Sequence, residues 1–351
     1  MTGRLSDNKI VKDDHIFRLT DDTGMLQHSK CWVPDPRHGY TTDDNARALI
    51  MSILLYKTYG DKKYIDLIYR FSSFLLYAQN EKGKFKNFMS YDRRWLEDEG
   101  SEDCFGRCIW ALGFALSCEY TPRGVKQALS HVFKKALPNI KLLNYPRAKA
   151  YSMIGLSFLD NIELKNLICD TAQSLCCLYE KNSDGDWKWF ENAVTYCNSV
   201  LPWSLFAAYR ITGNKKFLET AEGSMNFLGN ILFREGYFKP VGCNGWFPKG
   251  GEPAEFDEQP VEACETVLAY MEAYAATGNG KYISKAKECH AWYRGVNSKG
   301  LSLIDNETGG CFDGLTAQGV NHNMGAESII SYIISCISIY QKNVFNFKQF
   351  D

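Results

Sequence analysis

The stretch Tyr56-Lys-Thr-Tyr-Gly-Asp-Lys-Lys-Tyr-Ile65 decides the fold, because close copies of it follow two other apolar segments of the chain. The copies are Tyr209-Arg-Ile-Thr-Gly-Asn-Lys-Lys-Phe-Leu218 and Tyr274-Ala-Ala-Thr-Gly-Asn-Gly-Lys-Tyr-Ile283. In each copy a glycine ends one helical pattern and an Asp or Asn precedes the next, which is typical of a helix C-cap followed by a tight turn. The chain therefore repeats a helical hairpin.

Two weaker versions of this turn occur at residues 120–123 and 159–163, so five tight hairpins are expected. The first helix of each hairpin is apolar nearly all round, which is typical of burial on both sides, and the second is amphipathic. Another apolar segment near the C-terminus completes the series. The six predicted inner helices are Asp44–Tyr59, Asp103–Glu119, Arg147–Leu159, Asn198–Arg210, Val261–Thr277 and Gly325–Tyr340.

Six alternations of a buried and a half-exposed helix predict an all-α fold, an (α/α)6 toroid with an inner and an outer ring. A superhelical solenoid built from the same pairs is the alternative. We favour the closed ring because the count stops at six and each repeat is irregular. Residues 1–351 are expected to form one toroid domain, with residues 1–40 as an approach segment that packs on the barrel.

The composition excludes several classes of protein. Forty Lys and Arg residues balance 41 Asp and Glu residues, which leaves no basic excess for nucleic acid. No apolar run is long enough to span a membrane, and the 13 cysteines, with no CxxC pair, indicate free thiols in a reducing cytoplasm. No ligand spacing typical of a metal site occurs, so we expect neither a metal nor a cofactor. The oligomeric state is left open.

The long connections all lead from an outer helix to the start of an inner one: residues 80–102, 182–197, 233–260 and 296–324. In a toroid they emerge at one end, and long loops in a compact domain are usually functional. They and the N-terminal segment carry five of the eight tryptophans: Trp32, Trp95, Trp187, Trp189 and Trp246. Flat aromatic faces around a polar funnel are typical of sugar binding, although hydrophobic packing under the loops explains any single one equally well.

Acidic side chains begin four of the six predicted inner helices, which places them around one mouth. Hydrolysis of a glycosidic bond needs paired carboxylates, one protonated and one ionised. The candidate catalytic residues are Asp44, Asp103 and Glu258, with Asp43 and Glu327 in reserve. Helix caps, or ion pairs with Arg47 and Arg107, would explain several of these acids without any catalytic role.

We expect the helix N-terminus to keep Asp43 or Asp44 ionised, which suits a base. Desolvation beside neighbouring aromatic residues is expected to raise the pKa of Glu258, which suits an acid. A further set of residues is expected to hold the hydroxyls and ring faces of the substrate. This set is Arg47, Arg107, Trp189, Trp246, Gln259, Asp313, His322, Asn323, His28 and Glu191.

Two stretches near the N-terminus resemble an uncharacterised bacterial domain that often stands beside, or is fused to, glycosyltransferases. They are Leu19-Thr-Asp-Asp-Thr-Gly-Met-Leu-Gln-His28 and His38-Gly-Tyr-Thr-Thr-Asp-Asp-Asn-Ala-Arg-Ala-Leu49. The wider pattern, a toroid with carboxylates at its mouth, resembles the six-hairpin glycosidase superfamily. These resemblances imply an (α/α)6 fold, a sugar substrate, acid/base carboxylates and a glycosyltransferase as a functional partner. They assign no particular catalytic residue.

We therefore expect a cytoplasmic carbohydrate-active enzyme, first of all a glycoside hydrolase that cleaves an oligosaccharide. The alternatives are a sugar 2-epimerase and a non-catalytic glycan-binding module that accompanies a glycosyltransferase. The epimerase ranks lower on sequence alone, because its chemistry usually needs histidines that face each other across the funnel. Only His28, His38 and His322 are placed near the mouth.

Overall fold

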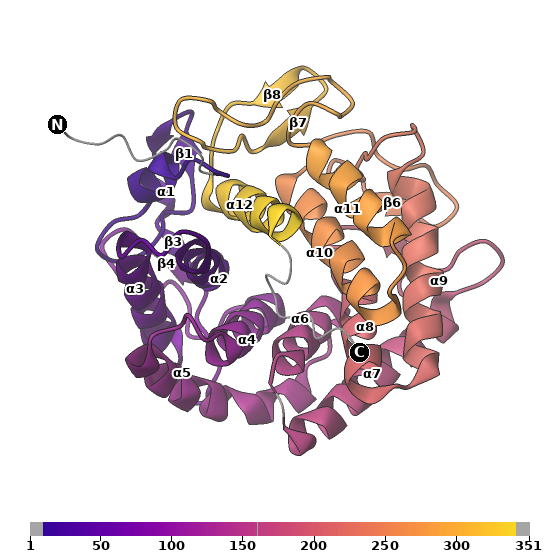
Figure 1. Cartoon of the computed structure of the whole chain (residues 1–351), viewed down its shortest axis with the longest axis horizontal. Coiled ribbons are helices and arrows are strands. Elements are labelled where there is room, and N and C mark those ends of the chain that lie inside the picture. The colour runs from indigo at the N-terminus through magenta and orange to yellow at the C-terminus, as the bar shows by residue number, and fades with distance from the viewer. Residues whose placement is uncertain (1–9, 160, 342–351) are drawn as a thin grey trace.

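The computed structural model describes residues 10–159 and 161–341, and its helices form two concentric rings (Figure 1). The inner ring comprises α2 (Thr42–Tyr59), α4 (Glu102–Ser117), α6 (Pro146–Ser157), α8 (Val200–Thr212), α10 (Pro260–Thr277) and α12 (Ala326–Tyr340). The outer ring comprises α3 (Lys63–Ala78), α5 (Arg123–Ala136), α7 (Ile162–Asn182), α9 (Lys215–Leu232) and α11 (Lys281–Ala291). Each inner helix packs against the next, and α12 packs against α2. The ring is therefore closed, as predicted, and is not a solenoid.

Three of the tight turns form because a glycine in the left-handed conformation ends the inner helix, as it does in α2, α8 and α10. Gly60, Gly213 and Gly278 have φ of 65°, 71° and 70°, and each donates its backbone N–H to the carbonyl four residues earlier. This is the αL C-cap expected from the repeated stretch. The observed inner helices begin and end within two residues of the predicted bounds.

The sixth outer position differs from the expectation of a sixth repeat. A short helix from the N-terminal segment, α1 (Asp14–Leu19), packs against α12 and lies outside it in Figure 1. The backbone N–H of His15 donates to the carbonyl of Thr308 at 3.2 Å, and its ring Nε2 lies 2.9 Å from the carbonyl oxygen of Met324. In the part of the chain that the structure describes, five hairpins and one pair from opposite ends of the sequence therefore complete the toroid.

The long connections meet at the end of the ring where the inner helices begin, and short antiparallel strands join them into a rim. The pairs are β1 (Ser29–Lys30) with β2 (Val33–Pro34), β3 (Tyr40–Thr41) with β4 (Phe88–Met89), β5 (Ala193–Val194) with β6 (Phe247–Pro248), and β7 (Gly314–Thr316) with β8 (Gly319–Asn321). Two 3₁₀ helices, Pro36–His38 and Leu137–Leu142, complete the described elements. The pair β3–β4 joins the N-terminal segment to the loop before α4, and β5–β6 joins the loops before α8 and α10, whereas the other two pairs each lie within one segment.

Glycines let α4 and α6 approach more closely than side chains would allow. A Cβ atom on Gly113 would lie 2.0 Å from the carbonyl oxygen of Gly155, and one on Gly155 would lie 2.3 Å from that of Ile109. Because the obstacles are backbone atoms, no change of rotamer can relieve the clash.

None of the helices in residues 10–159 and 161–341 combines the length and the apolar character that a membrane span requires.

Gly155→Ala is expected to destabilise the ring by about 2 kcal/mol, because overpacking a close helix contact outweighs the higher helix propensity of alanine. Urea denaturation monitored by circular dichroism measures the change. Gly124→Ala is the matched control, since Gly124 also lies in a helix but its Cβ would meet nothing closer than 4.0 Å. Equal effects of the two substitutions would contradict the tight packing of α4 on α6.

Candidate active site

A cavity of about 310 Å³ opens at the mouth of the ring, where α2, α10 and α12 begin. Most of its lining side chains are polar. They are Gln27, His28, Thr41, Asp43, Asp44, Arg47, Asn87, Phe88, Gln259, Asp313, Asn321, Glu327 and Ser328. We call this space the mouth cavity. Its volume lies at the lower end of the range of about 300–1,000 Å³ that is usual for small-molecule sites.

The acids at the start of α2 do not cap the helix. The backbone N–H groups of Thr42 and Asp43 donate to Oδ1 of Asn87, at 3.1 and 3.2 Å, so the loop before α4 supplies the cap. The side chain of Ser101 similarly accepts the N–H of Cys104 and caps α4. Capping therefore does not explain the acidic pair that begins α2, and its carboxylates lie in the mouth cavity instead.

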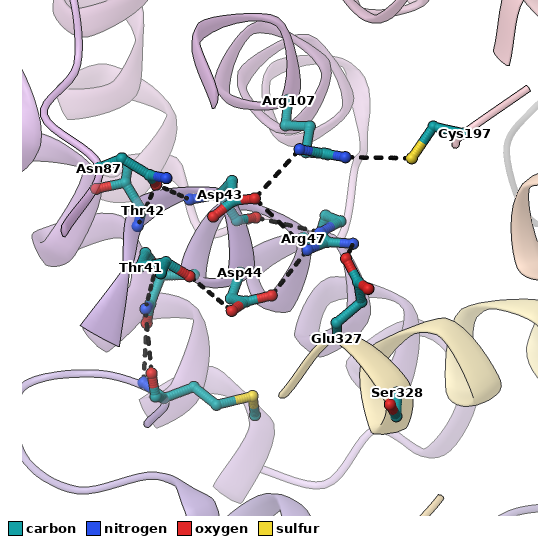
Figure 2. A network of polar contacts seen from close by, with 12 residues as sticks. Thr41, Thr42, Asp43, Asp44, Arg47, Asn87, Arg107, Cys197, Glu327 and Ser328 are labelled. Atoms are coloured by element: carbon teal, nitrogen blue, oxygen red, sulfur yellow. Dashed lines mark hydrogen bonds and ion pairs between the residues drawn. The ribbon is translucent and has the colours of Figure 1, made fainter. Parts of the chain in front are cut away.

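Arg47 gathers three carboxylates at the floor of the mouth cavity (Figure 2). Its Nη2 lies 2.7 Å from Oδ1 of Asp44 and 3.7 Å from Oδ2 of Asp43, and its Nη1 lies 2.9 Å from Oε2 of Glu327. The two aspartates precede Arg47 by one helical turn, so all three side chains share a face of α2. Glu327 comes from the first turn of α12, so this one guanidinium joins the two helices that close the ring.

Asp43 and Asp44 are neighbours in sequence, but their pKa values are shifted in opposite directions. Burial raises the pKa of Asp44 to about 7, and the charges of Asp43 and Glu327 add to the rise that Arg47 opposes. Burial opposes ionisation of Asp43 as well, but Arg107 and Arg47 outweigh it and lower the pKa of that carboxyl. At neutral pH the site thus holds one ionised carboxylate beside one that exchanges its proton readily.

Arg107 links the mouth cavity to the axis of the barrel. Its Nη1 lies 3.2 Å from Oδ2 of Asp43, and its Nη2 donates to Sγ of Cys197 at 3.2 Å (Figure 2). The guanidinium carbon lies 5.0 Å from the ring centroid of Tyr151, a cation–π contact. Arg107 therefore connects α2, α4, α6 and the loop before α8, and it keeps Asp43 charged.

Two buried acids on α10 were not among the predicted site residues. Glu262 accepts the backbone N–H of Cys197 and lies 3.3 Å from Nδ2 of Asn198, while burial and the nearby Glu265 raise the pKa of Glu262 to about 8. Glu265 accepts the hydroxyl of Tyr151, and burial raises the pKa of Glu265. The sequence could have indicated both acids, because an acidic residue on a helix that is buried on all sides has to contact other polar groups.

Glu258 lies elsewhere than predicted, although burial does raise its pKa. The side chain is fully buried and accepts Nε1 of Trp292 at 2.6 Å and the hydroxyl of Ser298. Its backbone pairs with Leu315, which turns the carboxyl behind the rim instead of into the mouth cavity. Glu258 is therefore not placed to act as the acid opposite Asp44 in the mouth cavity.

Trp189 also fails to reach the mouth cavity. It is fully buried, with its ring 5.3 Å from that of Phe190 and 6.0 Å from that of Phe227. Trp187 is buried in the same cluster, 5.2 Å from Phe247. Hydrophobic packing under the loops, the alternative explanation, therefore accounts for these two tryptophans.

The remaining predicted residues fall into three groups. His28, Gln259 and Asp313 line the mouth cavity with the acids of α2 and α12. His322 stacks beside Trp32 at 6.4 Å, and Oδ1 of Asn323 accepts the backbone N–H of Cys31 at 3.0 Å, so both hold the N-terminal segment. The third group lies around Tyr196, a residue that no sequence pattern singled out. Asp103 accepts the hydroxyl of Tyr196, and the ring of Trp246 lies 6.3 Å from the tyrosine ring. Glu191 pairs at 2.7 Å with Arg147, whose guanidinium lies against the ring of Tyr196.

Among the described residues, no group of three or more His, Cys, Asp or Glu side chains is arranged to hold a metal ion. Three acids of the mouth cavity, Asp43, Asp44 and Glu327, pair with arginine. Arg47 and Arg107, which form these pairs, are both buried.

The fold is shared with solved structures of sugar-active enzymes. The chain is similar to the cellobiose 2-epimerase from Bacillus thermoamylovorans B4167 (TM-score 0.72, 12% identity, 93% of this chain and 96% of that one). It is also similar to a D-mannose isomerase (TM-score 0.72, 11% identity, 93% of this chain and 94% of that one). A third similar structure is the cellulase Cel9M of C. cellulolyticum (TM-score 0.62, 11% identity, 90% of this chain and 87% of that one). At such identities the similarity establishes the six-hairpin (α/α)6 fold.

The sequence matches no protein-family model and no curated protein. The resemblance to a bacterial domain found beside glycosyltransferases, and the glycosyltransferase partner that it implies, therefore stay predictions.

Arg107→Gln is expected to lower the free energy of unfolding by about 3 kcal/mol, because it leaves a buried carboxylate with one partner fewer. The loss should be larger at pH 8 than at pH 5. Without Arg107 the pKa of Asp43 in the folded chain rises, so folding favours the protonated form and stability falls as the pH increases. Urea denaturation at both pH values measures this.

The matched control is Arg93→Gln. Arg93 pairs with Asp22, but both side chains are exposed, so little change is expected at either pH. A pH-independent effect of Arg107→Gln would show that the arginine serves packing alone.

Proposed function

We propose that this chain is a carbohydrate-active enzyme that moves protons on a sugar bound in the mouth cavity. The observation that carries the proposal is the pair of adjacent acids, Asp43 and Asp44, which meet at Arg47 and whose pKa values are shifted in opposite directions. Separated pKa values of neighbouring acids are what general acid–base catalysis near neutral pH requires. Burial of the pair against two arginines fixes the geometry and keeps bulk water away from the proton that moves.

Epimerisation or isomerisation of a reducing sugar is the reaction that we favour. His28 and Asp44 line the mouth cavity from different elements, the N-terminal segment and α2. Burial and the neighbouring His38 lower the pKa of His28, so its imidazole is neutral and accepts a proton while Asp44 donates one. One group removes the proton beside the carbonyl of the open-chain sugar, and the other returns a proton on the opposite face. The similarity to a 2-epimerase and an isomerase supports this reaction.

The histidines of the described residues are not arranged across the funnel as epimerase chemistry usually requires. His28 and His38 face each other at 4.8 Å within one segment, and His322 stacks against Trp32. No two histidines of the described residues line the mouth cavity from opposite sides. In this proposal the carboxyl of Asp44 fills the role of the second histidine as the group that exchanges a proton with the sugar.

Hydrolysis is the second candidate, favoured by the number of acids in the mouth cavity. Asp44 could protonate the leaving oxygen, while Asp313 or Glu327 activates water. Asp313 is held by the N–H of Gly325 at 2.6 Å and the hydroxyl of Ser328 at 2.7 Å, and burial raises its pKa. The structural similarity to a cellulase is consistent with this reaction.

Proton NMR in D₂O distinguishes the two reactions. Glucose, mannose, cellobiose and mannobioses are incubated with the chain and followed over time. Epimerisation is expected to place deuterium at C2 and to produce the C2 epimer, and isomerisation is expected to produce the ketose, both without cleavage. Release of a monosaccharide with no exchange at C2 assigns hydrolysis instead. If neither change occurs on any sugar, the enzymatic proposal is rejected.

Asp44→Asn is expected to reduce kcat/KM by about 10²–10⁴-fold, the contribution of a positioned acid or base. Because Asp44 acts as the proton donor and its pKa is about 7, the wild-type rate should fall as the pH rises above 7. Asp22→Asn is the control, since Asp22 is exposed and lies outside the mouth cavity. Retention of wild-type activity by Asp44→Asn, with an unchanged pH profile, contradicts this role.

A further inference from the structure

Tyr196 bridges three inner helices at the mouth. It belongs to the loop before α8, and its hydroxyl donates to Oδ2 of Asp103 at the start of α4. The guanidinium carbon of Arg147, at the start of α6, lies 4.7 Å from the ring centroid of Tyr196. Arg147 also donates to the backbone carbonyl of Tyr196 at 2.5 Å. The ring is therefore held at its hydroxyl, at its backbone and on one face.

The support beneath the ring is itself fixed. Arg147 is buried, and it binds Glu191 at 2.7 Å and the hydroxyl of Thr195 at 2.8 Å. Because these partners already fix the guanidinium of Arg147, little additional conformational entropy is lost when it packs against the aromatic face. Tyr196 is thus a preorganised platform and not a mobile surface tyrosine.

The platform adjoins the mouth cavity through α4. Asp103 precedes Arg107 by one helical turn, so the two side chains lie on the same face of the helix. Arg107 binds Asp43 inside the mouth cavity, and Asp103 holds Tyr196 one turn nearer the rim. One face of α4 thus connects Tyr196 to Asp43 through Asp103 and Arg107.

The exposed part of the platform has the composition of a sugar subsite. Tyr196 is 37% exposed although its neighbours fix it, and the ring of Trp246 lies 6.3 Å away at a tilt of 48°. Asp103 and Glu191 place carboxylate oxygens beside these rings. A pyranose offers an apolar face to the aromatic rings and hydroxyl edges to the acids.

We propose that Tyr196 and Trp246, flanked by Asp103 and Glu191, bind the second unit of a glycan whose reacting unit occupies the mouth cavity. The inference rests on the proposed function and deepens it, because it makes the substrate a disaccharide or a longer oligosaccharide and not a free monosaccharide.

Affinity, not turnover, tests the proposal. The wild-type chain and Asp44→Asn are each titrated with glucose, cellobiose, mannose and α-1,6-mannobiose, and the dissociation constants are measured by NMR. The affinity for cellobiose is compared with that for glucose, and the affinity for α-1,6-mannobiose with that for mannose. At least one disaccharide is expected to bind at least tenfold more tightly than its monosaccharide. Tyr196→Ala should reduce that ratio to below two, whereas Tyr196→Phe, which keeps the ring, should retain most of it.

Tyr120→Ala is the matched control. Tyr120 is 39% exposed and lies in the turn after α4, at the other end of the ring, so its removal should leave the affinity ratio unchanged. Circular dichroism shows whether each variant folds. The proposal is overturned if no disaccharide binds more tightly than its monosaccharide, or if Tyr196→Ala and Tyr120→Ala give the same ratio. Disaccharide preference without turnover on any sugar would reject the enzymatic proposal and leave this subsite standing.

Discussion

The ion pairs of Arg47 are the interaction on which both the ring and the site depend. This side chain is almost completely buried on α2, and it binds two acids of its own helix and Glu327 of α12. A buried guanidinium is costly unless it is fully paired, and the carboxylates around it repel one another unless it is present. The charge that closes the toroid between its first and last inner helices is thus the same charge that sets the protonation of Asp43 and Asp44.

The ring could be predicted from sequence because its signals are local. The glycines of the three repeated turns have to adopt a left-handed conformation, and the apolar helices before these turns are long enough to show that they are buried on every side. The position of α1 could not be predicted, because six residues carry too short a pattern to reveal an outer helix. Its place depends on contacts with α12, which lies far away in sequence.

The site was predictable only where a helix fixes the direction of the side chain. Asp43, Asp44 and Glu327 lie in the first turns of their helices and Arg47 lies one turn further along α2, so their common place at the mouth follows from the fold. Glu258 and Trp189 lie in loops, where a residue next to an expected site can point behind the rim or into the core. Tyr196 was missed for the same reason, since no periodicity distinguishes a loop tyrosine that bridges three helices from one that faces solvent.

The contact between α2 and α12 also has a consequence for the order in which the chain folds. Arg47 and Glu327 are separated by 280 positions, so the ribosome has to synthesise nearly the whole described chain before the two can meet. Hairpins of the toroid can form locally during synthesis, but contacts of such long range form late. A nascent or C-terminally truncated chain would hold an open ring in which Arg47 lacks its partner on α12, and chaperones and proteases recognise such exposed, incomplete rings. The set of charges at the mouth cavity is therefore complete only once the ring has closed.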